Sequence, residues 1–238
     1  MRSGGPSVTV ETNRRSLRLP TGPASRTPTC GPWTPTCGPW TTPGGAVPEN
    51  APRPLRADAR RNRERLLDAA VRAFSRPGAE VTLDAVAKDA GVGIGTLYRH
   101  FPTREALVEA AYRNELAKLC DSAEDLLGQL PPDAATRAWM DRFVDYLATK
   151  RGMADALRMV IAAGSNPYAQ SRDRLIATLT RLLDAAAAAG AVRSDVRPED
   201  VLAGLSGVSL AAGEPAQREQ ASRLLDLLMD GLRYRAPG

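Results

Sequence analysis

Apolar residues recur every three or four positions through most of the chain after residue 57, the spacing that gives an α-helix one buried face. In residues 58–74, for example, Leu66, Ala70, Ala73 and Phe74 share a face, and arginines occupy the opposite one. Only residues 191–196 alternate in the manner of a strand, and that segment is short. The pattern therefore predicts an all-α protein of about nine helices, over residues 58–74, 83–90, 93–100, 103–127, a segment from 133, 152–164, 167–190, 198–213 and 215–234.

Prolines and glycines mark the expected helix ends. Gly128 and the Pro131-Pro132 pair are expected to end the helix that begins at residue 103. Asp133 is expected to cap the helix that follows, and Pro198 stands where proline commonly begins a helix.

Residues 81–107 (VTLDAVAKDAGVGIGTLYRHFPTREAL) form the most informative segment of the chain. Thr82 is a suitable N-cap for a helix from residue 83, and Gly91 stands where the chain must leave that helix in left-handed geometry, which glycine adopts at little cost. Val92 is expected to fill the angle before a second helix over residues 93–100. Two short helices joined by a glycine turn predict a helix-turn-helix, whose second helix enters the major groove of DNA.

Leu97 and Phe101 lie four residues apart and are expected to anchor the second helix. The side chains then left outside or on the flanks are those of Ile94, Thr96, Tyr98, Arg99 and His100. A hydroxyl, a phenol, a guanidinium and an imidazole on one short helix suit phosphates and base edges. The next helix begins after Thr103, and its N-terminal amides and Arg104 are candidates for a further phosphate. Taken singly, Tyr98 and His100 are more consistent with partly buried core positions than with DNA contacts. Their joint placement after the glycine turn is what favours DNA binding.

The glycines at 91, 93 and 95 (GVGIG) also resemble a phosphate-cradling loop of a nucleotide-binding fold. Such a fold needs a buried strand directly before the glycines, whereas residues 85–90 (AVAKDA) have a helical period, so we exclude this interpretation. The chain has one histidine, and no grouping of residues typical of nucleophilic catalysis lies outside the turn. Cys30 and Cys37 have no further ligand nearby. We therefore expect no catalytic residues, no metal, no cofactor and no enzyme.

Residues 1–54 are rich in Pro, Gly, Thr and Ser and have no helical period. Residues 27–33 (TPTCGPW) are repeated directly at 34–40, but two copies of seven residues are too few and too short for a repeat fold. Such a composition buries too little apolar surface to offset chain entropy, so a disordered tail is expected. Two alternatives stay open: a basic arm that touches DNA, and a start codon assigned upstream of the true one.

The net charge of +5 over 238 residues and the pI of about 9.4 suggest a nucleic-acid partner, but the charge is unevenly distributed. Six arginines and two glutamates give residues 1–54 a net +4, so only +1 remains for the rest of the chain. No apolar run is long enough for a transmembrane helix, and no apolar secretion segment follows the first arginines. With three cysteines and no such signal, the expected location is the reducing cytoplasm, with no membrane partner.

On the residues described above, segment 58–112 resembles the N-terminal domain of the tetracycline repressor (TetR) family, and residues 87–107 are a near-complete match to its signature. The remainder is similar to the family only in the number and lengths of its helices and in a terminal helical hairpin. After the tail of 1–54, which the composition predicts, the resemblance implies two parts: a three-helix helix-turn-helix DNA-binding domain of 55–117, and a helical domain of 118–238 that binds an effector and dimerises.

The resemblance also implies roles for individual residues. Positions that face the bases in the family match Ile94, Gly95 and Thr96, and those that hold phosphates match Thr82, Tyr98, His100 and Arg104. Gly93 and Arg99 complete the expected set of DNA-contacting positions. Many members have Ser or Thr where this chain has Gly93, so a helix cap and a possible phosphate contact are missing here. Because glycine stands at both 93 and 95, we expect DNA shape to contribute more to specificity than direct readout.

Two features of the C-terminal half favour a homodimer. Segment 198–213 carries the small residues Gly204, Ser206, Gly207, Ala211 and Ala212, which permit close helix approach. The final helix has a stripe made of Ala221, Leu224, Leu225, Leu228 and Leu232. Together they would form a four-helix seam across a two-fold axis. The alternative is that both helices close the monomer's own core; we favour the dimer because a single helix-turn-helix gives too little DNA contact.

Candidate walls of an effector pocket are the aromatic, Met and Leu residues at helical spacing in this half, namely Trp139, Met140, Phe143, Tyr146, Met153, Leu157, Met159 and Tyr168. Such residues are more often ordinary core than pocket wall. Arg158 and Asp145 are expected in solvent. The pattern does not identify the ligand.

The sequence thus predicts a transcriptional regulator that binds a palindromic operator in double-stranded DNA as a homodimer, most consistently a repressor released by a small-molecule effector. The alternative function is that of a DNA-binding protein without an effector, architectural or regulated by a partner. A filled C-terminal core without a cavity would favour that alternative.

Overall fold

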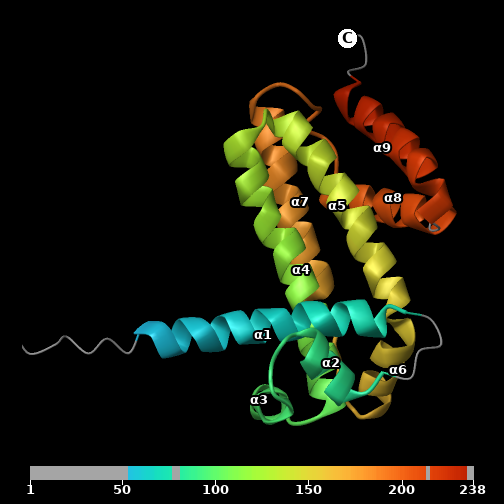
Figure 1. Cartoon of the computed structure of the whole chain (residues 1–238). Helices are drawn as coiled ribbons and strands as arrows, with labels where there is room; N and C mark the ends of the chain where they lie inside the picture. The colour runs from blue at the N-terminus through green and yellow to red at the C-terminus, as the bar shows by residue number, and fades with distance from the viewer. Residues whose placement is uncertain (1–52, 77–80, 213–214, 235–238) are drawn as a thin grey trace, which may run out of the picture. The chain divides into compact units, whose positions relative to one another are not determined.

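The computed structural model describes residues 53–76, 81–212 and 215–234. Within these ranges the chain forms helices and no strand, which confirms the all-α prediction (Figure 1). Residues 191–196, the strand-like segment, form bends instead. The helices are α1 Arg53–Phe74, α2 Leu83–Asp89, α3 Ile94–His100, α4 Arg104–Gln129, α5 Pro132–Gly152, α6 Ala154–Ala162, α7 Ser171–Ala188, α8 Pro198–Ala211, the short 3-10 helix η1 Pro215–Gln217, and α9 Arg218–Arg233.

The first helix begins earlier than the apolar pattern predicts. α1 starts at Arg53, so the last two residues of the expected tail are helical. Pro54 does not prevent this, because the first turn of a helix has no backbone N–H that needs an intrahelical partner. Residues 1–52, with the predicted disorder, the tandem repeat and its two cysteines, lie outside the described residues.

The boundary between α4 and α5 also differs from expectation. α4 continues through Gly128 to Gln129, because a glycine weakens a helix by only about 1 kcal/mol and does not by itself end it. The Pro131-Pro132 pair ends the helix, since a residue before proline avoids the α conformation. Asp133 lies inside the first turn of α5 instead of at its cap, and its carboxylate accepts a hydrogen bond of 2.7 Å from Arg233 of α9.

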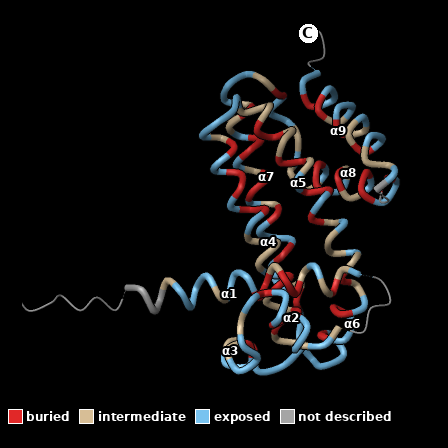
Figure 2. Tube along the Cα trace, in the orientation of Figure 1, coloured by how far each residue is buried: buried red, intermediate tan, exposed pale blue. Residues whose placement is uncertain are grey.

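The helix-turn-helix elements pack as one group. α1 contacts α2 and the first part of α4, and α2 contacts α3. The inner face of α1 carries fully buried residues, among them Leu66, Leu67 and Ala70. Figure 2 shows this buried surface where α1 meets the other helices, whereas most of α3 is exposed. The short helices are thus held by one apolar side each, which leaves their other side to solvent.

Helix α5 is at the centre of the remaining bundle and contacts α4, α6, α7, α8 and α9. Figure 1 shows α4, α5 and α7 running side by side. Trp139 and Phe143 of α5 are buried with their rings 5.7 Å apart, and the Trp139 indole N–H donates to the Leu119 carbonyl of α4 at 3.0 Å. A buried Trp needs such a partner, so this bond fixes the two helices against each other. None of the described helices combines the length and apolar character that crossing a bilayer requires.

The leucine stripe of α9 lies mainly inside its own chain. Ala221 and Leu225 are fully buried and Leu232 is 7% exposed. A Cβ added at Gly204 of α8 would meet the Leu228 side chain at 3.4 Å, so the small residue permits α8 and α9 to approach within one subunit. The three buried residues of the stripe pack within their own subunit, where α9 contacts α5 and α8, whereas Leu224 and Leu228 are half-buried; the four-helix seam between subunits stays a prediction.

Candidate nucleic-acid interface and effector cavity

The turn between α2 and α3 has the local geometry that the sequence predicts. The Thr82 hydroxyl oxygen accepts from the Ala85 N–H at 3.2 Å and so caps α2. Gly91 has a φ of 64°, the left-handed conformation. The Val92 N–H then donates to the Ala87 carbonyl at 3.0 Å, and the chain turns directly into α3. Each of these interactions spans at most five residues, which is why the motif is legible in the sequence.

Helix α3 is anchored by one side and exposed on the other. Leu97 and Phe101 are 0% and 3% exposed, as their spacing predicts. The side chains named as DNA contacts lie outside this anchor: Ile94, Tyr98, Arg99 and the two glycines 93 and 95 are exposed, and Thr96 and His100 are half-buried. Gly93 caps α3 through its backbone alone, with no side-chain hydrogen bond. The helix therefore presents polar groups and an isoleucine outward from a rigid apolar base.

Arg104 has intramolecular partners that the sequence did not indicate. Its guanidinium donates to the Val81 carbonyl and lies over the Phe74 ring, 4.8 Å from the centroid. Another arginine, Arg63 of α1, lies 5.5 Å from the centroid of Phe101. Both contacts join residues 20 or more positions apart in the chain. Arg104 thus connects the start of α4 to the end of α1 and to the residue before the α2 cap.

A cavity of about 210 Å³, half-open to solvent, lies among α4, α5, α7 and α8. Three of the residues predicted for an effector pocket, Phe143, Tyr146 and Tyr168, line it. Of the other five predicted residues, four are at most 1% exposed and pack in the core without reaching this cavity, namely Trp139, Met140, Met153 and Leu157. The fifth, Met159, is exposed on α6 and does not line the cavity either. The remaining lining residues, which the apolar spacing did not indicate, are Tyr112, Leu147, Lys150, Ser171, Arg172, Leu175, Leu202 and Ser206. Only tertiary packing brings these four helices to one place, so no local pattern identified them.

A chain of hydroxyl groups crosses the inner wall of this cavity. The Tyr146 hydroxyl donates to the Tyr112 hydroxyl at 2.8 Å, and the latter donates to the Ser171 hydroxyl at 3.2 Å. Burial, followed by the hydrogen bond with Tyr112, raises the pKa of the Tyr146 phenol, so it remains a neutral donor. The Tyr168 ring meets the Tyr112 ring edge-on at 5.3 Å. The network ties α4 to α5 and α7.

Lys150 is the cation nearest to these rings. Its Nζ lies 4.3 Å from the centroid of Tyr168 and 6.0 Å from that of Tyr112. The side chain is half-buried, and burial lowers the pKa of its ammonium group. Within the described residues it makes no ion pair. Its charge is therefore met by aromatic faces and not by a carboxylate.

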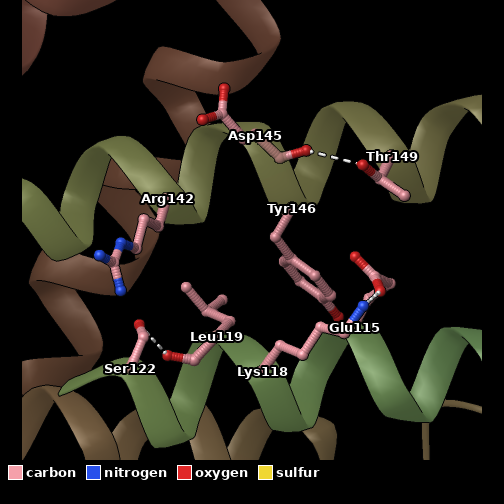
Figure 3. Close-up of a pocket in the computed structure, with 8 residues that line it drawn as sticks. All are labelled: Glu115, Lys118, Leu119, Ser122, Arg142, Asp145, Tyr146 and Thr149. Carbon is pink, nitrogen blue, oxygen red and sulfur yellow. Dashed lines mark hydrogen bonds and ion pairs between the residues drawn. The ribbon is translucent and has the colours of Figure 1, made fainter. Parts of the chain in front are cut away.

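A separate groove of about 280 Å³ lies between α4 and α5 (Figure 3). It carries both signs of charge, and its charges are largely paired: Lys118 contacts Glu115 at 2.8 Å and Asp68 at 2.7 Å, and Asp145 pairs with Arg218 at 3.3 Å. Asp145 and Arg158 are exposed, as expected. Charges of both signs that are largely paired are typical of the solvated surface between two packed helices.

Two short helices joined by a left-handed glycine, with the second helix exposed and a long helix running on into a helical bundle, define a helix-turn-helix DNA-binding protein. Residues 66–111 match the family model of bacterial regulatory proteins of the tetR family, and residues 131–234 match that of the C-terminal domain of SbtR-like transcriptional regulators. The chain belongs to the TetR family of transcriptional regulators and is a DNA-binding regulator.

Solved structures support the family assignment over the whole bundle. A TetR transcriptional regulator from Streptomyces coelicolor is 58% identical, with a TM-score of 0.70 and coverage of 73% of this chain and 99% of that one. A TetR transcription regulatory protein from Mycobacterium vanbaalenii is 36% identical, with a TM-score of 0.63 and coverage of 76% and 100%. HTH-type transcriptional regulators from Staphylococcus aureus are 36% identical over 63 residues, which is 26% of this chain and only 34% of theirs.

Proposed function

We propose that this protein is a homodimeric repressor that leaves a palindromic operator when a small molecule binds in its C-terminal cavity. The observation that carries the proposal is the continuity of α4. The helix begins at Arg104, directly after the exposed α3, and its Tyr112 forms part of the cavity wall. Eight residues of α-helix span about 12 Å, so the two sites share one rigid element.

The DNA contacts follow from the exposed side of α3. Ile94, Gly95 and Thr96 are proposed to face base edges, with DNA shape adding specificity where glycine offers no side chain. Tyr98 and Arg99, with Gly93 and His100 beside them, are proposed to meet the backbone. These groups, exposed except for the half-buried Thr96 and His100, project from a base fixed by buried apolar residues, which keeps their spacing constant.

Two proposed phosphate contacts already have partners within the chain. The Thr82 oxygen accepts from α2, yet its O–H hydrogen is still available to donate to a phosphate. Arg104 uses part of its guanidinium on the Val81 carbonyl, and the five N–H donors of an arginine leave others for a phosphate. Both residues would therefore act on DNA and on the local fold together.

Effector release is proposed to work through α4. A ligand that fills the cavity displaces Tyr112, which hydrogen bonds hold to Tyr146 and Ser171. Tilting α4 changes the separation of the two recognition helices in a dimer, which must match successive major grooves about 34–36 Å apart. The ligand favours one separation over the other and so lowers DNA affinity by linkage. The presence of a cavity favours this function over that of a DNA-binding protein without an effector.

The dimer is proposed to form through the outer faces of α8 and α9. Leu210 is 80% exposed and shares a helical face with Gly207 and Ala203, both exposed. Leu227 of α9 is 67% exposed and lies beside the half-buried stripe residues Leu224 and Leu228. Large apolar side chains at such exposure on adjacent helices are typical of a protein–protein contact.

The test is binding of the full chain to a palindromic fragment from its own promoter region, compared with a scrambled fragment of equal length and composition. A preference for the palindrome that weakens with added salt is expected. Tyr98→Ala should weaken binding to both fragments alike, because a phosphate contact carries no sequence information. No preference in the wild type would sink the proposal, and a Tyr98 variant that changed only base preference would contradict the phosphate assignment.

A further inference from the structure

The cavity described above adjoins a second one of about 310 Å³, and the two share Leu147, Lys150, Tyr168 and Ser206. Across both, the charged lining residues are Lys150, Arg151 and Arg172, and no Asp or Glu lines either cavity. The groove between α4 and α5 has two acidic and two basic residues in its lining. The joint cavity therefore differs from the other groove in carrying one sign of charge only.

Lys150 is central to this imbalance because both cavities reach it. The aromatic faces of Tyr168 and Tyr112 attract its ammonium group but do not neutralise it. A half-buried cation without a counter-charge destabilises its site, and an anion placed beside it removes that cost. Arg172, also on the lining, likewise makes no ion pair among the described residues.

The hydroxyl chain adds a donor to the same wall. Three hydroxyl groups, those of Tyr146, Tyr112 and Ser171, share two hydrogen bonds, so one O–H hydrogen is left over. When Tyr146 donates to Tyr112 and Tyr112 donates to Ser171, the remaining hydrogen belongs to Ser171, which is 7% exposed and lines the cavity. A ligand that accepts hydrogen bonds would satisfy this group.

The remainder of the inner wall is apolar. Phe143, Leu175 and Leu202 are buried and line the cavity away from solvent. Volumes of 210 and 310 Å³ fall at or below the lower end of the range of about 300–1,000 Å³ usual for small-molecule sites. A compact molecule with one apolar body fits these dimensions.

We propose that the effector is a compact organic acid, with its carboxylate paired to Lys150 and its apolar body among Phe143, Leu175 and Leu202. This inference rests on the proposed function, because it assigns the effector to the cavity beside α4. The Ser171 hydroxyl donates a hydrogen bond to the ligand from the inner wall. Arg172, which also lines the cavity, adds positive charge that attracts an anion.

The test is calorimetric titration of the full chain with phenylacetic, 3-phenylpropionic and 4-phenylbutyric acids and with the amide of each. Every amide keeps the shape of its acid and loses the charge. At least one acid is expected to bind about 10- to 100-fold more tightly than its amide, the factor for a hydrogen bond to a charged group. Lys150→Met should reduce that ratio to near one, Lys150→Arg should retain it, and Lys118→Met, in the other groove, should leave it unchanged.

The wild type alone can overturn the proposal, so it does not depend on the variants folding. If no acid of the series binds more tightly than its amide, or if none binds at all, the effector is not a compact organic acid. An undiminished preference for the acid in folded Lys150→Met would equally refute the assignment to Lys150. The proposed function fails by a different measurement, the loss of palindrome preference in the ligand-free wild type.

Discussion

Replacing Gly152 with alanine tests the contact between the DNA-binding helices and the bundle. Gly152 is the last residue of α5, and a Cβ at this position would lie 3.0 Å from the Cβ, 3.1 Å from the carbonyl oxygen and 3.2 Å from the Cα of Ser75. Two of the three atoms are backbone, directly after the end of α1. They cannot move aside as a flexible side chain can, so the end of α1 must shift.

The magnitude follows from two opposing effects. Carbon atoms prefer separations of about 3.5–4.0 Å, and overpacking of this kind costs about 1–3 kcal/mol. Alanine also stabilises a helix relative to glycine by about 0.5–1 kcal/mol. The free energy of unfolding should therefore fall by about 1 kcal/mol, which lowers the Tm of a chain this long by about 2–4 °C.

Gly128→Ala is the matched control. Gly128 is also near a helix end and exposed, and a Cβ there meets nothing within 4 Å. It should raise the Tm slightly, because only the helix preference remains. Both variants are compared with the wild type by thermal denaturation at one protein concentration, since the Tm of a dimer depends on concentration. If Gly152→Ala is as stable as Gly128→Ala, the close contact with Ser75 does not constrain the chain.

Three further predictions concern other sites. Arg104→Ala should weaken DNA binding, and it should also lower the free energy of unfolding by about 1–2 kcal/mol because a hydrogen bond and a ring contact are lost. Tyr98→Ala should weaken DNA binding but change the free energy of unfolding by no more than about 0.5 kcal/mol. Gel shift measures the DNA binding of both variants, and urea denaturation measures their stability. Lys150→Met should raise the free energy of unfolding at pH 7, because burial lowers the pKa of this lysine and so disfavours its charged form in the folded chain. The gain should shrink as the pH rises through the lowered pKa toward 10.5 and vanish above 10.5, where the lysine is neutral in both states. A gain that stayed constant with pH in urea denaturation would exclude a charge effect. Leu227→Glu should raise the dimer Kd at least about tenfold, as measured by sedimentation velocity. Met159→Glu is the control, because Met159 of α6 is a similarly exposed apolar residue, and it should leave the dimer Kd unchanged. Equal effects of the two variants would contradict the α9 interface.

Where the determinants of structure are close in sequence, the prediction was specific. The N-cap at Thr82, the left-handed Gly91 and the buried pair Leu97 and Phe101 all lie within 20 residues, and the structure has each as expected. Capping, chirality and helical spacing act through neighbouring backbone groups, so the residue types suffice to predict them. The exposed side of α3 then follows from its buried one.

Predictions were weaker where a residue's partner is distant. Helical spacing correctly placed Trp139 and Met140 on a buried face, but it could not say whether that face meets a cavity or a solid core. The same spacing predicts the apolar stripe of α9 without identifying its partner, because one apolar face can cover its own subunit or another. Lys150 was not singled out, since a lone lysine on a helix is usually in solvent.

The order of residues alone determined the class of fold, the helix-turn-helix and the side of its second helix that is exposed, because these depend on interactions that span a few residues. Only the tertiary structure decided that Arg104 joins α4 to Phe74, that Tyr112, Tyr146 and Ser171 meet, and that the adjoining cavities carry positive charge alone. Those contacts join helices far apart in the chain, and a periodic pattern states which face is buried without stating what it is buried against.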